Sequence, residues 1–119
     1  MSIHTQLFNK KMILIPINIA IHWSLAVILN PGKVLSSNQV DSCFDKEEPA
    51  ILFFDSYGCH NHDVIHENLC FWLNFQYRRV LKDQGQLGQN LEIPIPNIFN
   101  KDSLRLLIPK GRHEVAYNF

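Results

Sequence analysis

A histidine and an aspartate stand in apolar surroundings, where ionisable side chains are unusual. His22 is followed by Trp23 inside the apolar, β-branched stretch Ile13 to Leu29, and Asp55 directly follows a second apolar run, Ala50 to Phe54. A carboxylate that orients an imidazole is half of the arrangement that activates a catalytic nucleophile. These residues therefore indicate an acid–base pair delivered by two strands, and they raise the question of where a nucleophile lies.

The chain has three cysteines, Cys43, Cys59 and Cys70. An odd number without framework spacing indicates free thiols in a reducing compartment rather than a disulfide scaffold. Cys59 lies just past Asp55, Cys70 lies on a predicted helix, and Cys43 lies in a polar loop where we assign it no role. Because triads are defined by geometry, either of the first two could in principle attack, but structural thiols are the better interpretation.

Histidines and cysteines between residues 59 and 70 offer a different chemistry. His62, His66 and Cys70 recur every four residues, so a helix would place them on one face, and Cys59 and His60 stand just before them. Such a set could bind zinc, although the spacing lacks a second cysteine pair. A small zinc-binding domain that uses Cys59, His62, His66 and Cys70 therefore stays as an alternative. The simpler interpretation is surface histidines near a helix start, with no metal and no cofactor.

Three apolar runs predict the strands that must position His22 and Asp55. The first strand is expected over Met12 to Pro16 and ends at a proline, the second over His22 to Leu29, and the third over Ile51 to Phe54, with Asn18 to Ala20 as a short connection. Side chains alternate across a strand, so His22 shares a face with small residues. That face holds Ser24, Ala26 and Ile28, whereas Trp23, Leu25, Val27 and Leu29 lie on the other.

A helix is predicted over Asp63 to Lys82, with Asp63 as its N-cap and Gly85 as its end. Apolar side chains recur there at spacings of three and four residues: Ile65, Leu69, Trp72, Leu73 and Val80. Asn30-Pro31-Gly32 indicates a turn that opens a polar surface loop running to Glu48. The segment from Leu87 is expected to be irregular.

Composition limits the class of protein. The 119 residues suffice for one small domain, and 46% of them are hydrophobic, which is enough for a core. The formal net charge is zero, and no phosphate-binding glycine loop or basic stripe is present, so nucleic-acid and nucleotide roles have no support. Pro16, Asn18 and His22 interrupt the apolar run after Lys10 and Lys11, which argues against a signal peptide or a membrane span.

The phrases IPINIAIHWSLAVI and PAILFFDSYG resemble the catalytic core of the ubiquitin-like-specific proteases, the SUMO-processing cysteine peptidases, over about residues 8–82. In that family a V/I-P-x-N/H strand end is followed by H-W-x-L-x-V-I, by a strand that ends in D-S, and later by Q-x-x-x-x-D-C-G. The resemblance implies an α+β, papain-like fold with a small mixed sheet and a packed helix. It also implies that His22 is the base, that Asp55 orients it, and that Trp23 lines a tunnel for a Gly-Gly tail.

By the same resemblance, the function would be that of a thiol protease which processes or deconjugates SUMO or another ubiquitin-like protein in the nucleus or cytoplasm. No Q-x-x-x-x-D-C-G phrase occurs in residues 1–119, so the nucleophile and the oxyanion glutamine of the family are missing. We therefore expect a partial catalytic domain that is inactive alone and that exposes apolar surface. The alternative is a non-catalytic remnant that binds a ubiquitin-like tail through Trp23.

Overall fold

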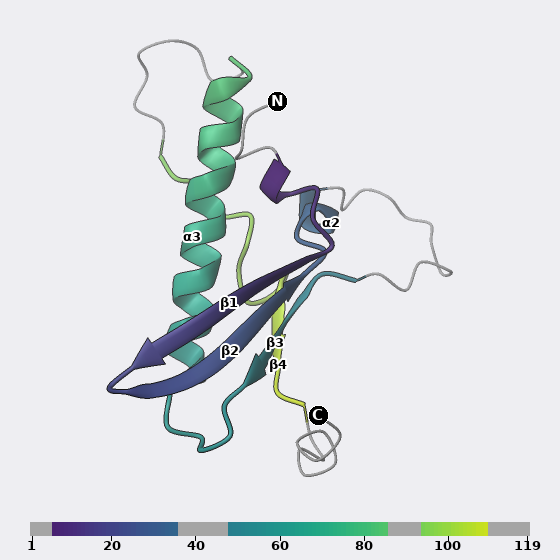
Figure 1. Ribbon diagram of the computed structural model, residues 1–119. Helices are drawn as coiled ribbons and strands as arrows, with labels where there is room; N and C mark the ends of the chain where they lie inside the picture. Colours follow the sequence, from purple (N-terminus) through teal and green to yellow (C-terminus); the bar gives the residue numbers. More distant parts are fainter. Residues whose placement is uncertain (1–5, 36–47, 86–93, 110–119) are drawn as a thin grey trace.

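The fold is a four-stranded sheet with one long helix against one of its faces (Figure 1). The computed structural model describes residues 6–35, 48–85 and 94–109. The strands are β1 (Met12–Ile19), β2 (His22–Leu29), β3 (Ala50–Phe54) and β4 (Arg105–Leu107), in that spatial order. β1, β2 and β3 pair antiparallel, whereas β4 is parallel to β3. The sheet is therefore mixed, and the predicted α+β class is confirmed.

The connection between β1 and β2 is tighter than predicted. β1 continues to Ile19, which pairs with His22, and the turn consists of Ala20 and Ile21, both at positive φ (53° and 56°). The prediction of a connection over Asn18 to Ala20 was therefore wrong. Positive φ at both central residues is the geometry of a two-residue hairpin turn, although neither residue is a glycine or asparagine, which such turns prefer.

The core lies between the sheet and helix α3 (His62–Asp83), which runs behind the sheet in Figure 1. Ala26 and Ile28 of β2, on the same strand face as His22, are fully buried, and they pair with Phe53 and Ile51 of β3. The helix contributes Ile65, Leu73 and Val80 to the same cluster. Most of the predicted core face is therefore confirmed, with Leu69 and Trp72 partly buried at its margin.

The N-cap of helix α3 is Asn61, two residues before the predicted Asp63, and the helix begins at His62. The Asn61 side-chain oxygen accepts hydrogen bonds from the backbone N–H groups of Asp63 and Val64, at 3.0 and 3.2 Å. The prediction of Asp63 as the cap was wrong because two residues of good capping type stand close together and only Asn61 has extended backbone (ψ 103°). Gly85, at φ 71°, follows the helix end as predicted.

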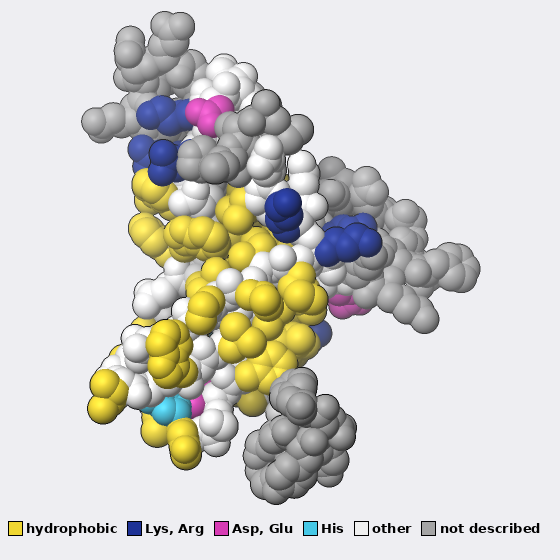
Figure 2. All heavy atoms as spheres, in the orientation of Figure 1, with side chains coloured by type: hydrophobic (Ala, Val, Ile, Leu, Met, Phe, Trp, Pro, Cys, Tyr) yellow, Lys and Arg dark blue, Asp and Glu magenta, His cyan; other side chains and the backbone are white. Residues whose placement is uncertain are grey.

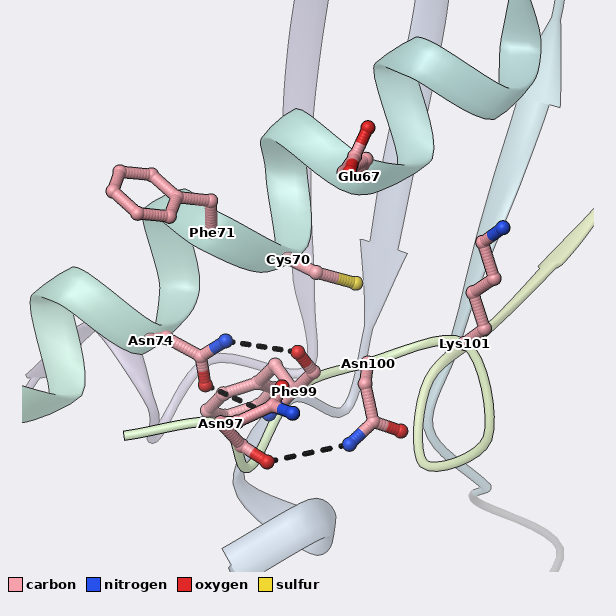
Figure 3. Close-up of a pocket in the computed structure, with 8 residues that line it drawn as sticks. All are labelled: Glu67, Cys70, Phe71, Asn74, Asn97, Phe99, Asn100 and Lys101. Carbon is pink, nitrogen blue, oxygen red and sulfur yellow. Dashed lines mark hydrogen bonds between the residues drawn. The ribbon is translucent and has the colours of Figure 1, made fainter. Parts of the chain in front are cut away.

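A short fourth strand lies in the segment that was expected to be irregular. Asn74, in the middle of α3, accepts a hydrogen bond from the backbone N–H of Phe99 and donates one to the Phe99 carbonyl (Figure 3). It also accepts from the backbone N–H of Ile98. The His66 ring bonds the Leu104 carbonyl at 2.6 Å. These bonds fasten the segment before β4 to the helix. The prediction of an irregular tail from Leu87 is thus wrong for Arg105–Leu107, while residues 86–93 and 110–119 lie outside the described part.

The predicted loop after β2 contains a short helix, α2 (Gly32–Leu35), which follows a turn with Asn30 at φ 49°. The rest of that loop, including Cys43, lies outside the described residues as far as residue 47.

The sheet face turned away from α3 is apolar and largely exposed along β1 and at Trp23, although Val27 on the same face is buried. Met12, Leu14 and Trp23 are 57%, 59% and 62% exposed on it, and the hydrophobic side chains gather over the strands in Figure 2. Single exposed apolar residues are ordinary, but a contiguous group on one sheet face is typical of a surface that another element or partner covers. The expected exposure of apolar surface is therefore present.

Candidate active site

The ring of His22 and the carboxylate of Asp55 meet at one end of the sheet. His22 is the first residue of β2, Asp55 is the residue after β3, and His22 Nε2 lies 2.7 Å from Asp55 Oδ1. The antiparallel pairing of β2 with β3 brings these positions together, since Leu25 pairs with Phe54. An ionised carboxylate can only accept hydrogen bonds, so Nε2 carries the proton. Nδ1 is then the basic nitrogen, and it has no hydrogen-bond partner within the described ranges.

Asp55 is held as an anion by donors on both oxygens. Its side chain is 4% exposed. Oδ1 also accepts from the Tyr57 backbone N–H at 3.3 Å, and Oδ2 accepts from the His60 backbone N–H at 2.8 Å. Burial alone would raise the pKa of this carboxyl, but the hydrogen bonds from His22, His60 and Tyr57 outweigh it and lower the pKa from 3.8 to about 2. Asp55 is therefore ionised at neutral pH.

Two further rings contact His22. The Tyr57 ring lies 4.9 Å from it between centroids, tilted by 57°, and the His60 ring lies 4.7 Å from it, edge to face at 76°. His60 also bonds the Ser24 hydroxyl at 2.6 Å. Sequence reasoning did not identify Tyr57, His60 or Ser24 as site residues. The one available signal for Ser24 was its place two residues from His22 on the same strand face.

Trp23 lies on the opposite face of β2 from His22. It pairs with Asn18 across the hairpin and is 62% exposed. It is therefore available to a partner, next to the end of the sheet where His22 lies.

The structure does not assemble the alternative metal or nucleophile sites. Within the described ranges, no group of three or more histidine, cysteine or acidic side chains could hold a metal ion. His66 is buried and bonded to Leu104, whereas Cys59 and His62 are exposed. Cys70 is 5% exposed, and burial raises the pKa of its thiol to about 11, which keeps it protonated and unreactive at neutral pH.

The arrangement can act as the proton-accepting half of a nucleophilic site. A neutral imidazole with one nitrogen bonded to a buried carboxylate presents the other nitrogen as a base, and the carboxylate stabilises the imidazolium that forms when a proton is taken. A thiol placed near Nδ1 of His22 would be activated in this way. A cysteine in that position is not found among the described residues, since neither Cys59 nor Cys70 hydrogen-bonds to the ring.

Comparison with known proteins agrees with this chemistry. Residues 2–77 match the Ulp1 protease family, C-terminal catalytic domain. The match covers more than half of the chain, so the chain belongs to the Ulp1 protease family. The earlier resemblance is thereby confirmed.

Three curated relatives, all from Arabidopsis thaliana, carry the corresponding names. Over 42% of its own length, this chain is 42% identical to probable ubiquitin-like-specific protease 2B. Over 52% of its own length, it is 38% identical to probable ubiquitin-like-specific protease 2A. It is 33% identical to ubiquitin-like-specific protease 1D over 75%. The matched parts span only 5%, 8% and 13% of these relatives. No solved structure matches the chain significantly.

No helix in the described part of the chain has both the length and the hydropathy that spanning a membrane requires.

Proposed function

We propose that this chain contributes the histidine–aspartate half of a thiol protease site that acts on SUMO or another ubiquitin-like protein. The observation that carries the proposal is the 2.7 Å contact between His22 and Asp55 in a chain of the Ulp1 protease family. His22 is the base and Asp55 its orienting partner. The reaction is hydrolysis after a Gly-Gly tail, in precursor processing or deconjugation, in the nucleus or cytoplasm.

The proposed fold is the papain-like arrangement in this family's variant. The mixed sheet with α3 on one face supports it. In this arrangement the nucleophile and the oxyanion glutamine come from a Q-x-x-x-x-D-C-G segment, which residues 1–119 do not contain. The chain by itself is therefore proposed to bind its modifier without cleaving it.

Trp23 is the proposed contact for the Gly-Gly tail. The experiment titrates the isotope-labelled chain with a mature SUMO protein and follows the Trp23 indole and His22 ring resonances by NMR. We expect both to shift, and we expect no shift with SUMO from which the two terminal glycines have been removed. Trp23→Ala should abolish binding, because the exposed aromatic surface is lost.

Phe71→Ala is the matched control, since Phe71 is 57% exposed on α3 and Trp23 is 62% exposed. This control should bind as the wild type does. An equal loss of SUMO binding in Trp23→Ala and Phe71→Ala, or binding that does not depend on the two terminal glycines of SUMO, would contradict the tail-binding role of Trp23.

Hydrolysis is tested separately. The chain is fused to a segment that carries the family's D-C-G phrase and is assayed on a SUMO precursor, with His22→Ala and Asp55→Asn alongside. We expect cleavage that depends on both residues. Cleavage by the unfused chain that His22→Ala abolishes would contradict the proposed need for an external nucleophile.

Binding without hydrolysis is the second candidate function. It is favoured by the absence of any thiol bonded to His22 within the described part of the chain, together with the exposed Trp23 next to the site. A fused chain that binds SUMO but never cleaves it would favour this candidate.

A further inference from the structure

His60 contacts several groups of the site, although its sequence context suggested metal binding rather than a place beside His22. His60 is only 8% exposed, and both of its ring nitrogens have hydrogen-bond partners. Nδ1 lies 2.6 Å from the Ser24 hydroxyl, and Nε2 lies 3.3 Å from the Ile19 carbonyl. A carbonyl only accepts, so Nε2 carries the proton and Nδ1 accepts from Ser24. The neutral ring is thus fully satisfied in a single tautomer and orientation.

Both partners of His60 belong to the hairpin end that holds His22. Ile19 is the residue that pairs with His22 in the β1–β2 ladder, and Ser24 follows His22 by two residues on the same face of β2. Anchored to these two points, the His60 ring lies edge to face against the His22 ring at 4.7 Å. This contact limits rotation of the His22 ring about its last side-chain torsion, on which the bond to Asp55 depends.

The backbone of the same residue reaches the other half of the pair. The His60 N–H donates to Asp55 Oδ2 at 2.8 Å, while His22 occupies Oδ1 at 2.7 Å. The position of this N–H depends on the backbone conformation of residues 56–60. The two ring hydrogen bonds of His60 attach the C-terminal end of this segment to the β1–β2 hairpin. One residue therefore constrains the imidazole through its ring and the carboxylate through its backbone.

We propose that His60 is a positioning residue for the His22–Asp55 pair: anchored by Ser24 and Ile19, it holds the ring plane of His22 and the second oxygen of Asp55. The inference rests on the proposed function for its catalytic meaning, but the geometry that it concerns exists without substrate. It can therefore be tested without any assay of binding or hydrolysis.

The test is NMR of the full chain on the alkaline side of neutrality, where a neutral ring reports its tautomer. Two quantities are measured: the tautomer populations from the His22 ring nitrogens at this pH, and, in a separate titration to acid pH, the pKa of Asp55 from its carboxyl carbon. In the wild type we expect His22 to be protonated on Nε2 alone. In His60→Phe, which keeps a ring but neither ring hydrogen bond, we expect both tautomers and an Asp55 pKa raised from about 2 by roughly one unit.

His66→Phe is the matched control, because His66 is also buried (7% exposed) and also bonds a backbone carbonyl, that of Leu104. It should lower stability without changing either quantity. If His60→Phe does not fold, Ser24→Ala removes one anchor alone and should give a smaller change in the same direction. The inference is overturned if the His60 and Ser24 variants that fold keep the wild-type His22 tautomer and Asp55 pKa. It is also overturned if His66→Phe changes the His22 tautomer and the Asp55 pKa as much as His60→Phe does. SUMO binding that fails in the wild type would count against the proposed function only.

Discussion

His22 and Asp55 are 33 residues apart in the chain, yet their side chains meet at 2.7 Å, and the Asp55 side chain is almost completely withdrawn from water. Two antiparallel strands create this contact, because β2 begins at the sheet end where β3 finishes. The pairing has consequences for stability as well as for chemistry.

Stability should depend on pH through Asp55. Its pKa in the folded protein is about 2, below the ordinary 3.8, so the ionised form favours folding. This contribution is complete above the unfolded pKa and is lost as the pH falls through the folded pKa. The difference corresponds to about 2 kcal/mol. Urea unfolding of the wild type should therefore show a fall in the free energy of unfolding between about pH 4 and pH 2 that Asp55→Asn lacks. Parallel curves for the two proteins would contradict it.

Asn74 should be among the most costly polar residues to truncate. Asn74→Ala removes three hydrogen bonds to Ile98 and Phe99 and leaves buried backbone groups unpaired. We expect a loss of roughly 3 kcal/mol in the free energy of unfolding. Hydrogen exchange should also become faster in β4. Asn68→Ala, at an exposed position of the same helix, is the control and should change stability little.

A substitution in the β1–β2 hairpin turn should increase the stability of the protein. Ile21 is β-branched, 95% exposed and at φ 56°, where a side chain is strained. Ile21→Gly should raise the free energy of unfolding by about 0.5 to 1 kcal/mol, since relief of strain exceeds the added entropy of the unfolded chain. Thermal unfolding measures it.

Gly58→Ala is the reverse control, at a glycine with positive φ between β3 and α3. Gly58 is at φ 68° with open space around the position of an added methyl group, so only the backbone is strained. Gly58→Ala should lower the free energy of unfolding by about 1 kcal/mol. Destabilisation by Ile21→Gly would show that the Ile21 side chain makes a contribution which its exposure does not suggest.

The two described cysteines should differ sharply in reactivity. Cys59 is exposed, whereas Cys70 is buried with its thiol pKa raised to about 11. Maleimide labelling at neutral pH, mapped by mass spectrometry, should modify Cys59 and should reach Cys70 only in denaturant. Equal rates in the folded protein would mean that the α3 face around Cys70 opens readily.

Much of the fold follows from local patterns. The second strand was predicted with its observed bounds, since it is a mostly apolar run after His22. Its burial is less regular than an alternating pattern, because Val27 is buried as well as Ser24, Ala26 and Ile28. Helix α3 followed from its apolar spacing. β4 could not be predicted in this way, because it has three residues and depends on hydrogen bonds from Asn74 and His66, which an apolar pattern treats as interruptions.

The site was predictable only in part. His22 and Asp55 stand out as ionisable residues beside apolar strands, but their contact depends on the register of β2 against β3, which no short-range signal determines. His60 lies 36 residues from Ser24, in a histidine-rich segment that suggested metal binding instead. Its bonds to the hairpin appear only when the strands and the start of α3 are placed together.

Whether Asp55 holds His22 as a base with Nδ1 free is tested by NMR of the His22 ring nitrogens in the wild type and in Asp55→Asn at alkaline pH. We expect a proton on Nε2 alone in the wild type and a mixture of tautomers in the variant, because an amide can either accept from or donate to the ring. A wild-type ring protonated on Nδ1, or the same mixture in both proteins, would contradict it.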